Sequence, residues 1–154
     1  MNVYISFDME GITGVSHWNQ VTSGHHEYPR YRAQLAREVI AACEGALAAA
    51  AQRIVVKDAH DTGRNLDGSE LPPGVELISG WSGHPLKMVQ EIDENFAAAL
   101  FIGYHTPAGL SGNALAHTFS SKKVATMFLN GQLASEYLIC AHAAEMFAVP
   151  VVFV

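Results

Sequence analysis

Apolar runs alternate with helix-like stretches along this chain. Residues 2–8 are too uniformly apolar for a strand with one face in water, so they predict a strand buried on both faces. The expected strands are 2–8, 54–58, 75–79, 97–103, 113–119, 123–129 and 150–154, and the expected helices are 28–51, 85–94 and 132–147. This alternation predicts an α/β layered fold with a central, mainly parallel sheet flanked by helices.

The chain length of 154 residues fits one domain of ordinary size. We therefore expect a single domain over residues 1–154. The last six residues, 149–154, are again apolar and strand-like, whereas a buried strand normally leads into a loop. Two explanations are considered: residues 1–154 are the N-terminal portion of a longer chain, or the last strand closes an edge of the sheet.

Two carboxylates, Asp8 and Glu10, follow the first apolar run directly. Side chains two positions apart lie on the same face of an extended chain, so both would point the same way. Two like charges held this close repel each other unless a cation neutralises them. The pattern is consistent with a divalent metal site, and equally with a solvated acidic turn.

The second and third long runs also end at residues that can bind a metal. His60 follows the run at 54–58, and His105 follows the run at 97–103. Because the carboxyl ends of parallel strands lie side by side, these imidazoles should converge on the carboxylates that follow the first strand. Imidazole combined with carboxylate favours zinc, although Mn, Co and Ni also accept such ligands.

Composition narrows the class of protein further. Hydrophobic residues make up 49% of the chain, the net charge is −6, and no cluster of Lys and Arg offers a face for phosphates. Nucleic acid is therefore excluded as a partner, and no apolar run is long enough to cross a membrane. Cys43 and Cys140 have no CxxC spacing and are expected to be buried thiols. With no signal peptide evident, we expect a cytoplasmic protein.

Four ordered segments carry a family resemblance. They are Ser6-Phe7-Asp8-Met9-Glu10-Gly11-Ile12, Asp58-Ala59-His60, Gly103-Tyr104-His105, and Asn130-Gly131 with Ser135-Glu136. Together with Leu77-Ile78-Ser79-Gly80 between them, they resemble the DppA-type D-aminopeptidases of peptidase family M55. The resemblance implies an α/β fold, a site for two zinc ions per subunit, and homo-oligomeric rings, for which we consider a decamer.

The resemblance also assigns roles by position. It implies that Asp8 bridges two metal ions, that Glu10 and His60 complete one, and that His105 and Glu136 hold the other. It implies that His117 is the catalytic histidine. Glu136 gains some support from its place early in a predicted helix at the tip of the sheet, although a capping glutamate fits that place as well.

The function implied is a zinc-dependent metallo-aminopeptidase that hydrolyses short peptides with N-terminal D-amino acids, such as D-Ala-D-Ala. His117 could stabilise the tetrahedral intermediate, pass a proton to the leaving amine, or attack directly. Family members continue well beyond a strand like 150–154, which leaves two alternatives. These are a non-catalytic, metal-stabilised peptide-binding subunit and a truncated inactive form. A dinuclear phosphoesterase fits poorly without a basic cluster.

Overall fold

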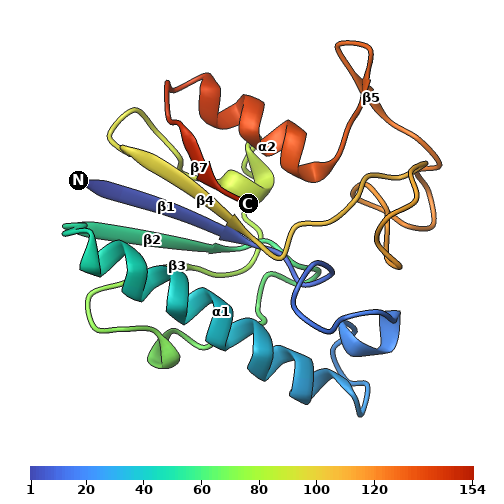
Figure 1. The fold of residues 1–154 in the computed structure, drawn as a ribbon, viewed down its shortest axis with the longest axis horizontal. Coiled ribbons are helices and arrows are strands. Elements are labelled where there is room, and N and C mark those ends of the chain that lie inside the picture. Colours follow the sequence, from blue (N-terminus) through green and yellow to red (C-terminus); the bar gives the residue numbers. More distant parts are fainter.

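The computed structural model describes residues 1–154 and is built on one five-stranded sheet (Figure 1). The strands are β1 (Asn2–Phe7), β2 (Arg53–Asp58), β3 (Glu76–Ile78), β4 (Ala98–Ile102) and β7 (Val151–Phe153). They lie in the order β3-β2-β1-β4-β7, and every neighbouring pair is parallel. The expected α/β fold with a central parallel sheet is confirmed.

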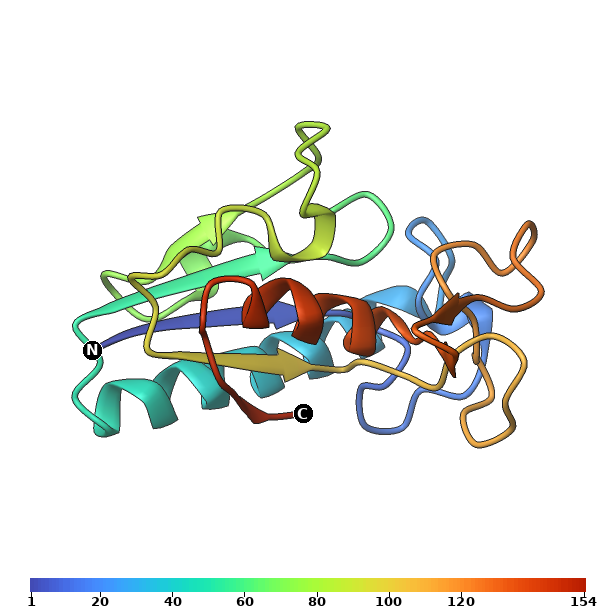
Figure 2. The ribbon, with the colours of Figure 1, turned by 90° about the horizontal axis from the view of Figure 1, so that it is seen from above.

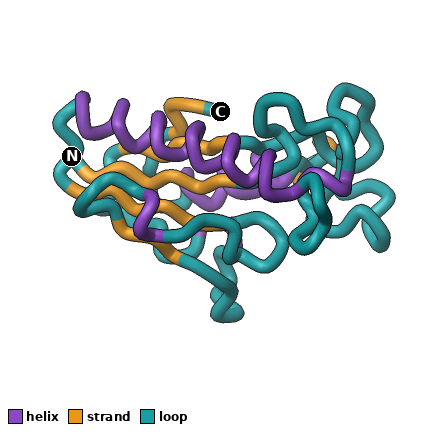
Figure 3. Tube along the Cα trace, turned by 90° about the horizontal axis from the view of Figure 1, so that it is seen from below, coloured by secondary structure: helices purple, strands orange, loops and turns teal.

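Two helices cover the two faces of this sheet (Figure 1). They are α1 (Tyr28–Ala48) and α2 (Glu136–Glu145). Figure 3 shows α1 running along the sheet, with the loops gathered beyond one end of the strands. With a helix on each face, a central strand has no face in water.

Alternate side chains of β1 enter two separate hydrophobic cores. Val3, Ile5 and Phe7 pack in the core on the α1 side, and Tyr4 packs in the core on the α2 side. All four side chains are buried, at no more than 2% exposed. Burial on both faces is the physical reason why the first run is apolar at nearly every position.

The carboxyl ends of β1, β2 and β4 all point to the end of the molecule where the longest loops gather (Figure 2). The loop after β1 is tied to the one after β4, because Gly11 N–H donates to the Gly103 carbonyl at 2.8 Å. A Cβ on Gly11 would come within 2.1 Å of the Tyr104 carbonyl oxygen. The two loops can approach this closely only because residue 11 has no side chain.

Several predicted elements are wrong in the middle of the chain. The expected helix at 85–94 is only a 3₁₀ turn, Lys87–Val89, and left-handed backbone at Lys87 (φ 45°) and Glu91 (φ 67°) interrupts it. The expected strand at 113–119 is a loop. The expected strand at 123–129 is reduced to β5 (Phe128–Leu129). Leu115 of the loop at 113–119 packs in the core on the α1 side, whereas Phe128 of β5 is exposed.

The predicted helix at 132–147 begins later than expected. Asn130 and Gly131 both have positive φ, and they form the turn of a hairpin between β5 and β6 (Gln132–Leu133). The Ser135 hydroxyl then accepts from Leu138 N–H at 2.9 Å and caps α2. Glu136 is therefore the first residue of the helix, and it does not lie one turn inside it.

Neither α1 nor α2 combines the length and the apolarity that crossing a lipid bilayer requires.

The two cysteines are buried free thiols, as expected. Cys43 in α1 and Cys140 in α2 lie on opposite sides of the sheet. Burial raises the pKa of Cys43 to about 11 and that of Cys140 to about 12, so both stay protonated at neutral pH.

Candidate metal centre

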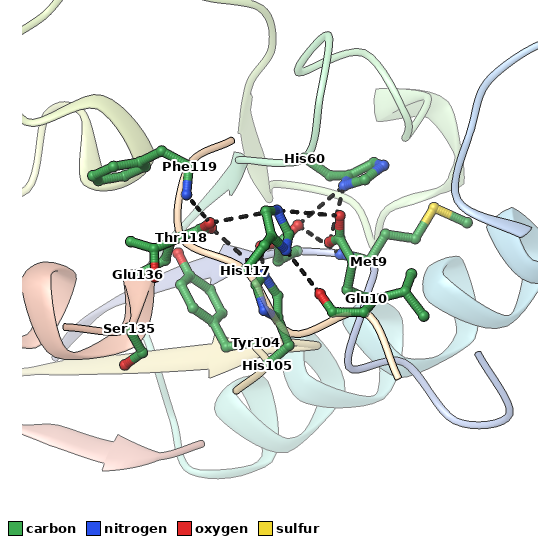
Figure 4. A network of polar contacts seen from close by, with 12 residues as sticks. Met9, Glu10, His60, Tyr104, His105, His117, Thr118, Phe119, Ser135 and Glu136 are labelled. Carbon is green, nitrogen blue, oxygen red and sulfur yellow. Dashed lines mark hydrogen bonds and ion pairs between the residues drawn. The ribbon is translucent and has the colours of Figure 1, made fainter. Parts of the chain in front are cut away.

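Six chemically active side chains meet at the carboxyl end of the sheet (Figure 4). They come from the loop after β1, the loop after β2, the loop after β4, a distant loop, and the first residue of α2. All six are at most 9% exposed. In chain order they are Asp8, Glu10, His60, His105, His117 and Glu136. The convergence that the sequence predicts for these residues is present.

The first set of potential metal ligands joins Asp8, Glu10 and His60. His60 Nδ1 lies 3.1 Å from Asp8 Oδ1 and 3.2 Å from Glu10 Oε2. These three side chains can therefore offer two carboxylate oxygens and one imidazole nitrogen to one ion, which is a donor set suited to zinc.

The second set joins Asp8, His105 and Glu136. His105 Nε2 lies 3.4 Å from Asp8 Oδ2 and 3.7 Å from Glu136 Oε2. Asp8 thus belongs to both sets, and it faces each with a different oxygen. A carboxylate placed this way can bridge two cations and offset the repulsion between them.

His117 lies beside both sets. Its Nε2 is 3.6 Å from Glu136 Oε1 and 3.8 Å from Glu10 Oε1. Its ring stacks on the His105 ring, with centroids 4.2 Å apart and planes within 3°. On another side, the Trp18 ring packs against it edge-on at 5.2 Å. Glu10, His105 and His117 also form a possible ligand set, so its place alone fits either a ligand or a proton carrier.

In each imidazole, the ring nitrogen that faces away from the carboxylates lies within hydrogen-bond distance of a backbone carbonyl. His60 Nε2 is 2.8 Å from a carbonyl of the first loop, that of Val21. For His105 and His117 the Nδ1 atoms lie 3.0 Å and 2.9 Å from carbonyls of neighbouring residues, Thr106 and Leu115. Metal-binding histidines usually donate their other N–H in this way, which fixes ring and tautomer. These partners have no signature in the sequence, because every residue has a backbone carbonyl.

The charges of the cluster depend on one another. Burial alone would lower the pKa of His60, but Asp8 and Glu10 outweigh it and raise that pKa to about 11. In the same way Asp8 and Glu136 outweigh burial and raise the pKa of His105 to about 11. Burial raises the pKa of Glu10, and the charge of Asp8 adds to that. A divalent cation would compete with protons for these imidazole nitrogens.

The residues fit zinc by a test that is independent of relatives. Glu10 Oε2 and His105 Nε2 are buried and have no hydrogen-bond partner. Buried polar atoms in proteins are nearly always paired, so such an atom needs an explanation. One of these atoms belongs to each of the two sets that share Asp8. A zinc ion in each set would satisfy both atoms.

A cleft of about 700 Å³ opens over the cluster. Besides the polar side chains, three aromatic residues line it, namely Trp18, Trp81 and Phe119. Trp18 and Trp81 are 37% and 44% exposed and form walls of the cleft. Phe119 N–H donates to Glu136 Oε1 at 2.6 Å, which fixes one carboxylate oxygen of that residue.

Asp58 does not contact the imidazole of His60, whose nitrogens face Asp8 and the Val21 carbonyl. Its carboxylate accepts from Asn65 Nδ2 at 2.9 Å and from Leu66 N–H at 3.1 Å, so it organises the loop after β2. Asn65 Nδ2 also donates to the His60 carbonyl at 2.6 Å. Asp58 therefore acts on the backbone of His60 through Asn65, and not on its imidazole.

Other histidines lie outside this cluster. His142 is on the exposed face of α2, and its Nδ1 lies 3.0 Å from Glu145 Oε2. His25, His26 and Glu27 could in principle hold a metal, but they do not line the cleft.

Comparison with known proteins places the chain in a family. The model of the M55 peptidases, described as D-aminopeptidase, matches residues 1–154. The D-aminopeptidase of Bacillus subtilis (strain 168) is 33% identical over 154 residues, which is all of this chain and 55% of that protein. The chain thus spans about half the length of the curated relative it matches.

A solved structure is similar over the same region. It is the Zn-dependent D-aminopeptidase DppA from Bacillus subtilis, described as a self-compartmentalizing protease. The TM-score is 0.88 at 31% identity, and the match covers 98% of this chain and 54% of that one. Because the family model matches every residue of the sequence, the chain belongs to the M55 family of D-aminopeptidases.

Proposed function

We propose that this protein is a zinc-dependent aminopeptidase that hydrolyses short peptides with N-terminal D-amino acids, such as D-Ala-D-Ala. The observation that carries the proposal is the position of Asp8, whose two oxygens face two different sets of potential zinc ligands at the floor of one cleft. Membership of the M55 family and similarity to a zinc-dependent relative support it.

The ligand roles follow from the two sets. Glu10 and His60 would hold one zinc ion, and His105 and Glu136 would hold the other. Asp8 would bridge the pair. Bound at this place, zinc would supply a Lewis acid for the scissile carbonyl and would lower the pKa of a water toward about 7.

His117 is suited to proton transfer. Its Nδ1 faces the Leu115 carbonyl, which leaves Nε2 directed at the carboxylates of Glu10 and Glu136. A histidine held by one nitrogen can accept a proton at the other and deliver it to the leaving amine. We therefore assign His117 as general acid and base, beside the zinc ligands and not among them.

The walls of the cleft restrict water and orient the substrate. Trp18 packs edge-on against His117, and Phe119 holds Glu136 through its backbone N–H. Aromatic walls next to the carboxylates lower the local dielectric, which strengthens every charge interaction made there.

We also propose that the protein assembles into a homo-oligomeric ring, and a decamer is the size we consider. The relative described as self-compartmentalizing supports assembly from copies of one chain. Gel filtration with light scattering tests this, because a single chain has a mass of 16.6 kDa. A monomer at all concentrations would contradict the ring.

The decisive experiment measures zinc and turnover on the same sample. Zinc per chain is counted by mass spectrometry, and release of free alanine is followed from D-Ala-D-Ala and from L-Ala-L-Ala. We expect about two zinc ions per chain, with turnover that prefers the D-peptide, stops with a chelator and returns with zinc. Zinc binding without turnover of either peptide would favour the non-catalytic peptide-binding alternative.

A further inference from the structure

The cleft has a marked division of charge. The carboxylates of Asp8, Glu10 and Glu136 line its floor, whereas the only lysines or arginines that line it are Lys87 and Lys122. A short peptide with both ends free carries a positive charge at one end and a negative charge at the other. A cation on the wall of the cleft could therefore recognise the second end.

Lys87 is exposed and makes no ion pair with any acidic residue. Its ammonium lies 5.0 Å from the centroid of the Phe119 ring. Contact with an aromatic face attracts the cation but uses none of its N–H donors, so these remain available to an anion. A further lysine, Lys57, lies behind the cleft wall with its ammonium 4.4 Å from the centroid of the Trp81 ring. It is fully buried and donates to the Gly80 carbonyl at 2.6 Å.

Backbone conformation at Lys87 and Phe119 is unusual. Their φ angles are 45° and 58°, in the left-handed region that side chains other than glycine rarely adopt. Such conformations have an energetic cost and tend to cluster at functional sites. Here both residues lie on the wall of one cleft and contact each other. The two residues with left-handed backbone thus lie on the part of the cleft wall that carries Lys87.

Lys87 lies near Glu136, one of the candidate metal ligands. Phe119 links the two, because its N–H binds the Glu136 carboxylate at 2.6 Å and its ring contacts the Lys87 ammonium. Only one residue therefore separates the lysine from the cluster.

We propose that Lys87 binds the C-terminal carboxylate of the substrate, and so makes the enzyme selective for peptides with a free C-terminus. This inference rests on the proposed peptidase function, whose carbonyl-activating site lies in the same cleft. Lys87 is a specificity residue and takes no part in bond cleavage.

The test compares D-Ala-D-Ala with its C-terminal amide on the zinc-loaded protein. We expect the wild-type protein to prefer the free acid by about ten- to one-hundredfold in kcat/KM, the range for a charge-assisted hydrogen bond. Lys87→Gln, which keeps the aliphatic stem and removes the charge, should lose this preference mainly through a higher KM for the acid. Lys87→Arg should retain most of it.

Lys123→Gln is the matched control, because Lys123 is exposed on the adjoining loop but does not line the cleft. An equal loss for acid and amide in Lys87→Gln, or no preference in the wild-type protein, would overturn the proposal. If neither peptide is hydrolysed, the proposed peptidase function fails, and calorimetry then tests carboxylate binding by Lys87 separately. Tighter binding of the acid than of the amide, lost in Lys87→Gln, would support the role of Lys87. Equal binding of the two peptides, or no binding, would overturn it.

Discussion

His105 and His117 form a parallel stack, with ring centroids 4.2 Å apart and planes within 3°. Each ring has its Nδ1 against a backbone carbonyl, so both Nε2 atoms face the carboxylates at the floor of the cleft. The two rings have the same orientation but different neighbours, which indicates different roles for His105 and His117. His105 Nε2 is buried without a hydrogen-bond partner, whereas His117 is not among such groups.

This difference predicts that His117→Asn keeps its zinc and loses its activity. Removal of a general acid and base should lower kcat by about 10²- to 10⁴-fold. Zinc per chain and alanine release are measured together, with His142→Asn on the exposed face of α2 as the control. A fall in zinc content in His117→Asn would make this residue a ligand, and an unchanged kcat would remove it from the chemistry.

Asp8→Asn should remove zinc from both positions, because its carboxylate is shared by both ligand sets. Glu136 belongs to only one of these two sets, so Glu136→Gln should keep about one zinc ion per chain. Quantitative metal analysis after dialysis distinguishes the two variants, and Glu94→Gln, on the exposed surface, is the control. Full zinc retention in Asp8→Asn is incompatible with a bridging role.

Removal of zinc should destabilise the protein, because the metal binds only the assembled site. At a free zinc concentration of one hundred times Kd, one bound ion adds about 2.7 kcal/mol to the free energy of unfolding. Thermal unfolding with zinc and with a chelator measures this. The zinc-dependent rise in Tm should be absent from Asp8→Asn, and a rise of the same size in that variant would place the stabilising zinc elsewhere.

Asn65→Ala should weaken zinc binding from outside the cluster. Asn65 is buried, and its side-chain amide links the Asp58 carboxylate to the His60 carbonyl. Its loss leaves buried acceptors without a donor, at a cost of about 2 kcal/mol in stability. Zinc affinity should fall about tenfold, as when a partner that orients a ligand is removed. Asn95→Ala, on the surface, should change neither quantity.

Gly11→Ala should destabilise the protein by about 3 kcal/mol or more, because its Cβ would lie 2.1 Å from the Tyr104 carbonyl oxygen. In contrast, Gly45→Ala lies within α1 and meets nothing within 4 Å. Replacement of a helical glycine by alanine should stabilise the protein by about 0.5–1 kcal/mol. Chemical denaturation of both variants tests the contrast, and an equal effect would show that the loop after β1 can move away.

Sequence patterns located the parallel strands because both faces of this sheet are covered. A doubly covered strand must be apolar throughout, and that leaves a run such as 2–8 which stands out in the sequence. The same topology places residues after successive strands at one end of the sheet. This is why the sequence alone predicts that Asp8, His60 and His105 lie close together.

Patterns failed where apolar residues serve the site instead of the sheet. Residues 113–119 have the composition of a strand, but they form a loop that presents His117 beside the carboxylates. Lys87 and Phe119 adopt left-handed backbone that no propensity favours. Such conformations are stable only because the surrounding contacts hold them, so local sequence gives no sign of them.

By itself the sequence therefore determined the α/β sheet and the meeting of Asp8, Glu10, His60 and His105 at its carboxyl end, because buried strands leave apolar runs and parallel strands end side by side. His117 and Glu136 were assigned through the family resemblance. Only the tertiary structure decided which oxygen of Asp8 faces which histidine, which carbonyl holds each ring, and which cation faces the cleft. These relationships depend on contacts between distant segments and on backbone atoms, which every residue has alike.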